Sequence, residues 1–99
     1  MGVKGSLLEH LIEMRRTLGG EQGLSRLAGF VDGFTAAQIH LGASDPAARE
    51  FFLWLRDVRG EFPPEGWKVK LSRDCGGDEV AAVRRFLDLV VEFVRLKGL

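Results

Sequence analysis

The sequence has one cysteine, Cys75, among its 99 residues. A lone cysteine cannot form an intramolecular disulfide, which agrees with a reducing compartment. The chain also lacks any apolar run near the roughly 20 residues that span a bilayer, and its N-terminus lacks the hydrophobic core of a signal peptide. We therefore expect a cytoplasmic protein without a membrane-spanning segment.

The chain has no net charge, because fourteen Lys and Arg residues balance fourteen Asp and Glu residues. It therefore has no global field that would draw it to nucleic acid or to an anionic membrane. Its composition, 45% hydrophobic and 28% charged, is that of a globular protein and not of a disordered one. A chain of this length suits one core, so we predict a single domain over residues 1–99.

Motifs for catalysis or cofactor binding are missing. His10, His40 and Cys75 lie far apart and form no pair at metal-ligand spacing. Cys75 also has no histidine beside it to activate a thiol nucleophile. The glycine pairs Gly19-Gly20 and Gly76-Gly77 lack the lysine of a phosphate-binding loop. We predict no catalytic, metal or cofactor-binding residue, and hence a protein that is not an enzyme.

The strongest positive signal is a long helix over residues 78–97. Asp78 suits the N-cap, and Gly98 follows the last turn. Seven residues recur at steps of three and four, and the apolar ones among them are expected to face the core: Val83, Phe86, Leu87, Val90, Phe93, Val94 and Lys97. Leu89, Val91 and Leu96 fall outside that stripe. The helix is thus expected to be the central post of a bundle or to be partly covered by a partner.

Two further helices are expected in the first half of the chain. Ser6 and Glu9 match a capping box, which predicts a helix over residues 6–18 that ends at Gly19-Gly20. A second helix follows over residues 24–41, with its predicted inner positions at Leu24, Leu27, Val31, Phe34, Gln38 and Leu41. Gly29 and Gly33 form a small-residue side with Ala36 and Ala37. These small residues indicate either that another helix packs closely on this side, or that the helix tolerates or kinks at its glycines.

A third helix should begin at Pro46, behind the N-cap candidate Asp45, and end before Gly60. Its predicted inner face is Ala48, Phe51, Phe52, Leu55 and Val58. Leu53 and Trp54 fall outside this face. We expect these two side chains either to pack beneath neighbouring loops or chain ends, or to form an exposed apolar contact site.

Residues 61–66 contain Pro63 and Pro64 and predict a stiff loop. Residues 67–72 alternate apolar and polar side chains like a strand, but the chain offers no partner strand. We therefore favour a short helix over residues 67–74, with Trp67 and Leu71 on one face. The predicted fold is all-α, with four helices and a short fifth packed around the long C-terminal helix.

Several segments resemble a group of small, mostly uncharacterised bacterial proteins. The resemblance rests on Phe30-Val31-Asp32-Gly33-Phe34, Gly66-Trp67, Gly76-Gly77-Asp78-Glu79 and Arg85-Phe86-Leu87-Asp88-Leu89-Val90. It covers about residues 9–95 and implies a helical partner protein of the toxin-immunity type. Its motifs are helix-packing residues, so it transfers no functional residue to this chain.

The favoured function is protein binding, with an immunity or antitoxin protein as one version. A homo-oligomeric structural subunit is the alternative, and a small-ligand sensor is the third hypothesis. The predicted contact residues surround the 61–70 loop: Trp54, Phe62, Trp67, Lys68 and Lys70. The alternative for Trp67 is that its ring closes the end of the helical core. Trp67 with Lys68, Lys70 and Arg73 would also suit a nucleic-acid strand. The zero net charge and acidic flanks argue against that partner.

Overall fold

The computed structural model describes residues 4–17 and 23–99, and this part of the chain contains five α-helices and no strand. The helices are α1 (Leu7–Thr17), α2 (Leu24–His40), α3 (Pro46–Asp57), α4 (Trp67–Asp74) and α5 (Glu79–Lys97). The all-α prediction is confirmed, and residues 67–74 form a helix and not a strand. The predicted stop at Gly19-Gly20 lies outside the described residues.

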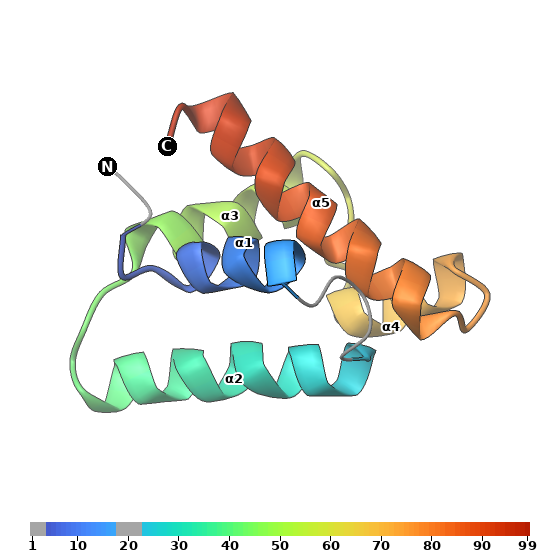
Figure 1. Cartoon of the computed structure of the whole chain (residues 1–99), viewed down its shortest axis with the longest axis horizontal. Helices are drawn as coiled ribbons and strands as arrows, with labels where there is room; N and C mark the ends of the chain where they lie inside the picture. The colour runs from blue at the N-terminus through green and yellow to red at the C-terminus, as the bar shows by residue number, and fades with distance from the viewer. Residues whose placement is uncertain (1–3, 18–22) are drawn as a thin grey trace.

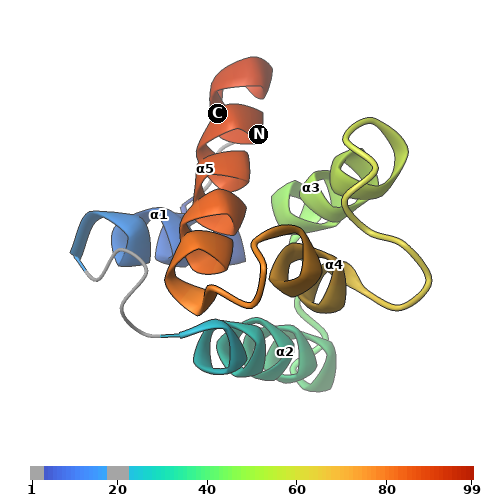
Figure 2. The ribbon, with the colours of Figure 1, turned by 90° about the vertical axis from the view of Figure 1, so that its right-hand side faces the viewer.

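The long helix α5 is the centre of the bundle, because it contacts each of the other four helices. Figure 1 shows α5 running diagonally across the molecule, and Figure 2 shows α1 on one side of it, α3 and α4 on the other, and α2 below. None of the described helices combines the length and apolar character needed to cross a membrane.

Because neighbours cover α5 from several sides, a wide arc of its surface is buried: Ala82, Val83, Phe86, Leu87, Leu89, Val90 and Phe93. The expectation that this helix is the centre of the bundle is confirmed: Leu89, which widens the apolar surface beyond one stripe, is buried, whereas Leu96 is 65% exposed. Asp78 caps the start of α5 by accepting a hydrogen bond from the Ala81 amide at 3.0 Å. Gly98 ends the helix with a φ of 67°, which glycine adopts without steric cost.

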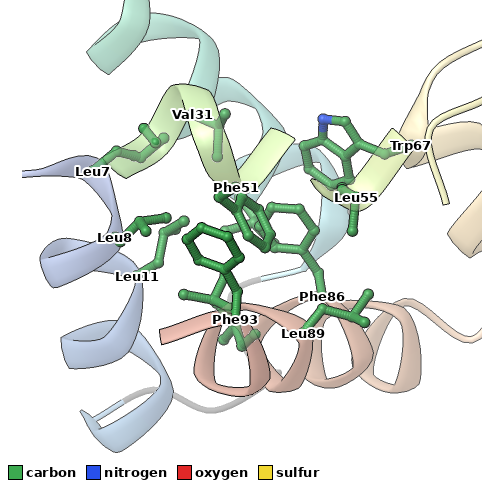
Figure 3. Packing of buried hydrophobic residues seen from close by; sticks show 14 of the residues in the cluster. Leu7, Leu8, Leu11, Val31, Phe51, Leu55, Trp67, Phe86, Leu89 and Phe93 are labelled. Carbon is green, nitrogen blue, oxygen red and sulfur yellow. The ribbon is translucent and has the colours of Figure 1, made fainter. Parts of the chain in front are cut away.

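Aromatic rings from α3 and α5 fill the middle of the core (Figure 3). Phe51 meets Phe86 and Phe93 edge-on, with ring centroids 5.8 and 5.6 Å apart. These are favoured geometries, because the positive edge of one ring faces the negative face of the other. Leucines from α1 close one side of this cluster, and Trp67 from α4 closes another.

One carboxylate joins the starts of α1 and α3. Asp45 accepts a hydrogen bond from the Ala48 amide at 3.1 Å and so caps its own helix. It also accepts from the Ser6 hydroxyl at 2.7 Å and from the Leu7 amide at 2.8 Å, at the start of α1. The predicted capping box is confirmed for the serine, whose hydroxyl accepts from the Leu8 amide at 3.1 Å, while Glu9 accepts from the Gly5 amide at 3.3 Å.

The predicted faces of α3 need two corrections. Trp54 is buried, because it faces Phe93 on α5 at 5.4 Å between ring centroids. Val58, the C-cap residue of α3, is 69% exposed, although its amide still donates to the Trp54 carbonyl at 2.9 Å. Leu53, at 39% exposed, lies at the surface.

The small-residue side of α2 does not pack closely within the described chain. A Cβ atom built on Gly29 or Gly33 would meet no heavy atom within 4 Å, apart from the helix's own backbone. The two glycines therefore have no packing role against residues 4–17 and 23–99, although each costs a helix interior about 1 kcal/mol relative to alanine.

The shared cap can be tested by comparing two aspartates. Asp45→Ala removes hydrogen bonds to two helix starts, and Asp78→Ala removes the cap of one. One N-cap is worth about 0.5–2 kcal/mol, so we expect Asp45→Ala to cost about 2–4 kcal/mol and Asp78→Ala about 1 kcal/mol. Urea unfolding of both variants measures this. Equal losses of unfolding free energy in the two variants would mean that the hydrogen bonds from α1 to Asp45 do not stabilise the fold.

Candidate functional site

The two tryptophans predicted as partner anchors lie in the core. Trp54 and Trp67 are each 7% exposed. Trp54 packs on Phe93, and the Trp67 indole stacks on Phe86 with ring centroids 4.2 Å apart and an interplanar angle of 22°. Neither ring projects toward solvent, so neither can serve as a large contact surface without a rearrangement of the core. The same burial leaves Trp67 unable to stack a nucleobase in this conformation.

The other predicted contact residues differ in exposure. Phe62 is half-buried, and its ring meets Phe52 edge-on at 6.0 Å. Lys68 is exposed, whereas Lys70 is half-buried and joins an ion-pair cluster. The structure therefore does not gather these residues into one exposed patch, and partner binding at the 61–70 loop stays a prediction.

Glu61 is the centre of that cluster. Its side chain is 7% exposed and accepts a hydrogen bond from Lys70 Nζ at 3.2 Å. Arg85 of α5 holds the same carboxylate with Nη2 3.2 Å from Oε1 and Nε 3.3 Å from Oε2. Lys70 also pairs with Asp74. The cluster therefore fastens the 61–66 loop to α4 and α5.

The charges of the cluster are set by two opposing effects. Burial disfavours the charged carboxylate of Glu61, but hydrogen bonds from Arg85 and Lys70 outweigh it, so its pKa lies below the usual value. The pKa of Lys70 is raised by its hydrogen bonds to Asp74 and Glu61. Lys70 and Arg85 thus favour the charged form of Glu61, and these contacts hold the loop against α4 and α5. Sequence reasoning missed the cluster, since Glu61 follows no periodic pattern.

The histidines and Cys75 do not assemble into a metal site. Within residues 4–17 and 23–99, no three His, Cys, Asp or Glu side chains gather closely enough to hold an ion. His10 packs against the rings of Phe30 and Phe34, with centroids 6.2 and 5.2 Å away. His40 is exposed at the end of α2, and Cys75 is half-buried at the end of α4.

An open, largely apolar groove lies between the second half of α2 and the start of α3, with the start of α1 beside it. It has a volume of about 330 Å³. We call it the α2–α3 groove and define it by its lining residues: Leu7, Phe34, Thr35, Gln38, Ile39, Ala43, Asp45, Ala48, Arg49 and Phe52. The Asp45 carboxylate at this groove is already occupied by the two helix starts.

The groove exists because α2 extends beyond the core. Its buried residues, Leu24, Leu27, Ala28 and Val31, all lie in its first half. Phe34 is half-buried in the second half, and Ile39 and Leu41 are 74% and 76% exposed. The prediction that Leu41 continues the inner face of this helix is therefore wrong, because no other described helix covers that end of α2.

Comparison with known protein families, with curated proteins and with solved structures finds no match to this chain.

The buried Glu61 predicts a pH-dependent contribution to stability. Its folded pKa is lowered, so the unfolded chain binds more protons in acid, and the stabilisation is lost as pH falls through that pKa. We expect Glu61→Gln to cost about 1–3 kcal/mol near pH 7 and progressively less below about pH 4. Urea unfolding across this range measures the difference. Glu65→Gln, which alters an exposed pair with Arg73, is the control. If Glu61→Gln lowered the free energy of unfolding equally at pH 7 and below about pH 4, the lowered pKa of Glu61 would be contradicted.

A second pair of variants tests the core position of the indole. Trp67→Ala removes a buried ring and should cost about 3–5 kcal/mol, whereas Lys68→Ala, at the exposed neighbour, should change stability by less than about 0.5 kcal/mol. Thermal or urea unfolding gives both values. A Trp67→Ala variant as stable as the parent would place the ring outside the core.

Proposed function

We propose that this chain is a non-enzymatic protein-binding domain and that its partner docks in the α2–α3 groove. The observation that supports this most is the unsupported second half of α2. Its apolar side chains Phe34 and Ile39 line an open groove, and no residue of the helix after Val31 is buried. A partner that covered this groove would complete the packing that the protomer leaves unfinished.

The energetics of α2 favour such a partner. Helical segments shorter than about 12–15 residues are marginal in water when nothing packs against them. Gly33, Thr35 and Ile39 lower the helical preference of this half further, through backbone freedom or β-branching. Burying an exposed Ile39 or Leu41 is worth about 1.5–3 kcal/mol each, so contact with a partner would stabilise the helix as well as the complex.

The groove replaces the 61–70 loop as the preferred contact site. Trp54 and Trp67 are buried in the core, and Lys70 forms ion pairs with Glu61 and Asp74. Lys68 alone of the predicted contact residues is fully at the surface. An exposed lysine by itself contributes little binding energy, because its ammonium stays hydrated and its side chain loses rotamer freedom.

The kind of partner remains a proposal. The resemblance to immunity proteins favours a toxin that is neutralised by direct contact, and a homo-oligomeric subunit is the alternative. The groove volume also falls at the lower end of the range of about 300–1,000 Å³ for small-molecule sites. A sensor would need several free polar groups converging there, and Asp45 is already used by two helix starts.

Site-specific photocrosslinking in the native host tests the groove. A photoreactive residue placed at Thr35 or Gln38 should give a discrete protein adduct, because both positions line the groove. The same residue placed at the exposed Val69 of α4 is the matched control. Mass spectrometry of the adduct identifies the partner. Crosslinks of equal yield from Val69, or none from the groove positions of a folded protein, would contradict the proposal.

A further inference from the structure

We infer that the outer face of α5 binds an acidic segment of another protein. We define this α5 face by six exposed charged residues: Arg15, Arg59, Arg84, Asp88, Glu92 and Arg95. They come from α1, from the segment after α3 and from α5 itself. None of them lines the α2–α3 groove, so the α5 face is a contact surface beyond the one in the proposed function.

The α5 face is the side of this helix that the other described helices leave uncovered. In Figure 2, α1 flanks α5 on one side, α3 and α4 lie on the other, and α2 lies below. Arg84, Asp88 and Arg95 follow one another at intervals of four and seven residues, which places them on one side of a helix. All three are exposed, so another molecule has access to them.

The two carboxylates of the α5 face are already paired within the chain. Asp88 Oδ1 lies 2.9 Å from Arg15 Nε, and Glu92 Oε1 lies 3.6 Å from Arg59 Nη1. Each pair joins one negative and one positive side chain, so the two pairs add no net charge. The charge of the face therefore depends on its other two residues.

Arg84 and Arg95 supply that charge. Neither forms an ion pair with another residue in the part of the chain that the structure describes. The neighbouring Arg85 differs, because it holds Glu61. The α5 face thus has a local excess of positive charge in a chain whose net charge is zero. Complementary charge steers association, and at 0.1 M salt it acts over about 10 Å.

The cations of the α5 face are all arginines, which suits the recognition of carboxylates. A guanidinium presents a planar fork that donates two parallel hydrogen bonds to one carboxylate, and it is more weakly hydrated than an ammonium. Arginine is also enriched among the few residues that dominate binding energy. Two arginines that pair with no carboxylate of the described residues are therefore suited to carboxylates of a partner.

Apolar side chains lie beside these arginines. Leu96 is 65% exposed and Val91 is half-buried, and both line an open hollow of about 550 Å³ together with Arg95. Protein contact surfaces commonly combine an apolar centre with a polar rim. A partner that paired with the arginines would cover these two apolar side chains as well.

The spacing of the charges favours a protein segment over nucleic acid. Arg84 and Arg95 are eleven residues apart, which is roughly 16 Å along a helix. Each strand of duplex DNA carries a phosphate about every 3.4 Å along the axis, so several phosphates would fall near Asp88 and Glu92 between the two arginines. Separate carboxylates on a protein segment can meet the arginines and avoid these acidic positions.

A second copy of this chain fits the α5 face poorly. Close to a two-fold axis each surface meets its own copy, so the excess positive charge of one face would meet the same excess on the other. An acidic segment of a different protein meets this charge with the opposite sign. The α5 face therefore favours a heterologous contact.

Fluorescence anisotropy with a labelled peptide tests the pairing. The probe is a helical peptide of about 20 residues, with two glutamates about three turns apart and leucines between them on the same side. We expect it to bind the whole chain with a dissociation constant below about 1 mM, and more weakly as the salt concentration rises. The double variant Arg84→Glu with Arg95→Glu should bind at least tenfold more weakly. A peptide with lysines in place of the glutamates should bind this variant instead.

A matched control separates local recognition from net charge. Arg26→Glu with Lys68→Glu changes the net charge by the same amount at exposed positions of α2 and α4, and it should retain the parent affinity within about twofold. Circular dichroism should show that both double variants are folded. If the folded parent does not bind the glutamate peptide, or if the control loses as much affinity as the α5 variant, the inference is overturned.

A single-stranded DNA oligonucleotide is the second probe. If it binds more tightly than the glutamate peptide, and if Arg84→Glu with Arg95→Glu removes that binding, the α5 face is a nucleic-acid site and the acidic protein segment is overturned. None of these outcomes bears on the α2–α3 groove, because crosslinking from Thr35 and Gln38 tests the proposed function separately.

Discussion

The arrangement of α1 beside α3 depends on one carboxylate. Asp45 accepts hydrogen bonds from its own helix α3 and from Ser6 and Leu7 at the start of α1, so two positively polarised helix ends share one negative charge. This contact fixes how α1 sits beside α3, and it places Leu7 next to Ala48 at the groove. The aromatic core then fills the space between α3 and α5, and Glu61 fastens the remaining loop to α4 and α5.

The sequence predicted the helices well because their signals are local. Pro46 behind Asp45, the Asp78 cap and Gly98 act within a turn of the helix ends that they mark, and the structure places those ends accordingly. The short helix α4 was also favoured over a strand, since no partner strand was present. Which face of each helix is buried depends on distant neighbours instead. Leu89 is therefore buried, and Val58 and Leu41 are exposed, because neighbouring helices cover more or less than one stripe at these positions.

The candidate site was harder to predict than the fold. Trp54 and Trp67 were chosen for their residue type, and only the packed structure shows that Phe93 and Phe86 cover them. Glu61 contacts a residue 24 positions away, which no periodicity reveals. The exposed second half of α2 was not predicted either, because a periodic run that continues to Leu41 does not show where the neighbouring helices end.

The position of α5 in the chain affects the order of events during synthesis. Proteins emerge from the ribosome N-terminus first, and a domain folds when its interacting parts are all present. Here the helix that contacts every other helix is also the last of the five to be made, and it contributes Phe86 and Phe93 to the core. Until it emerges, α1 to α4 lack the surface against which they pack. The nascent chain therefore cannot complete this core until α5 has emerged from the ribosome.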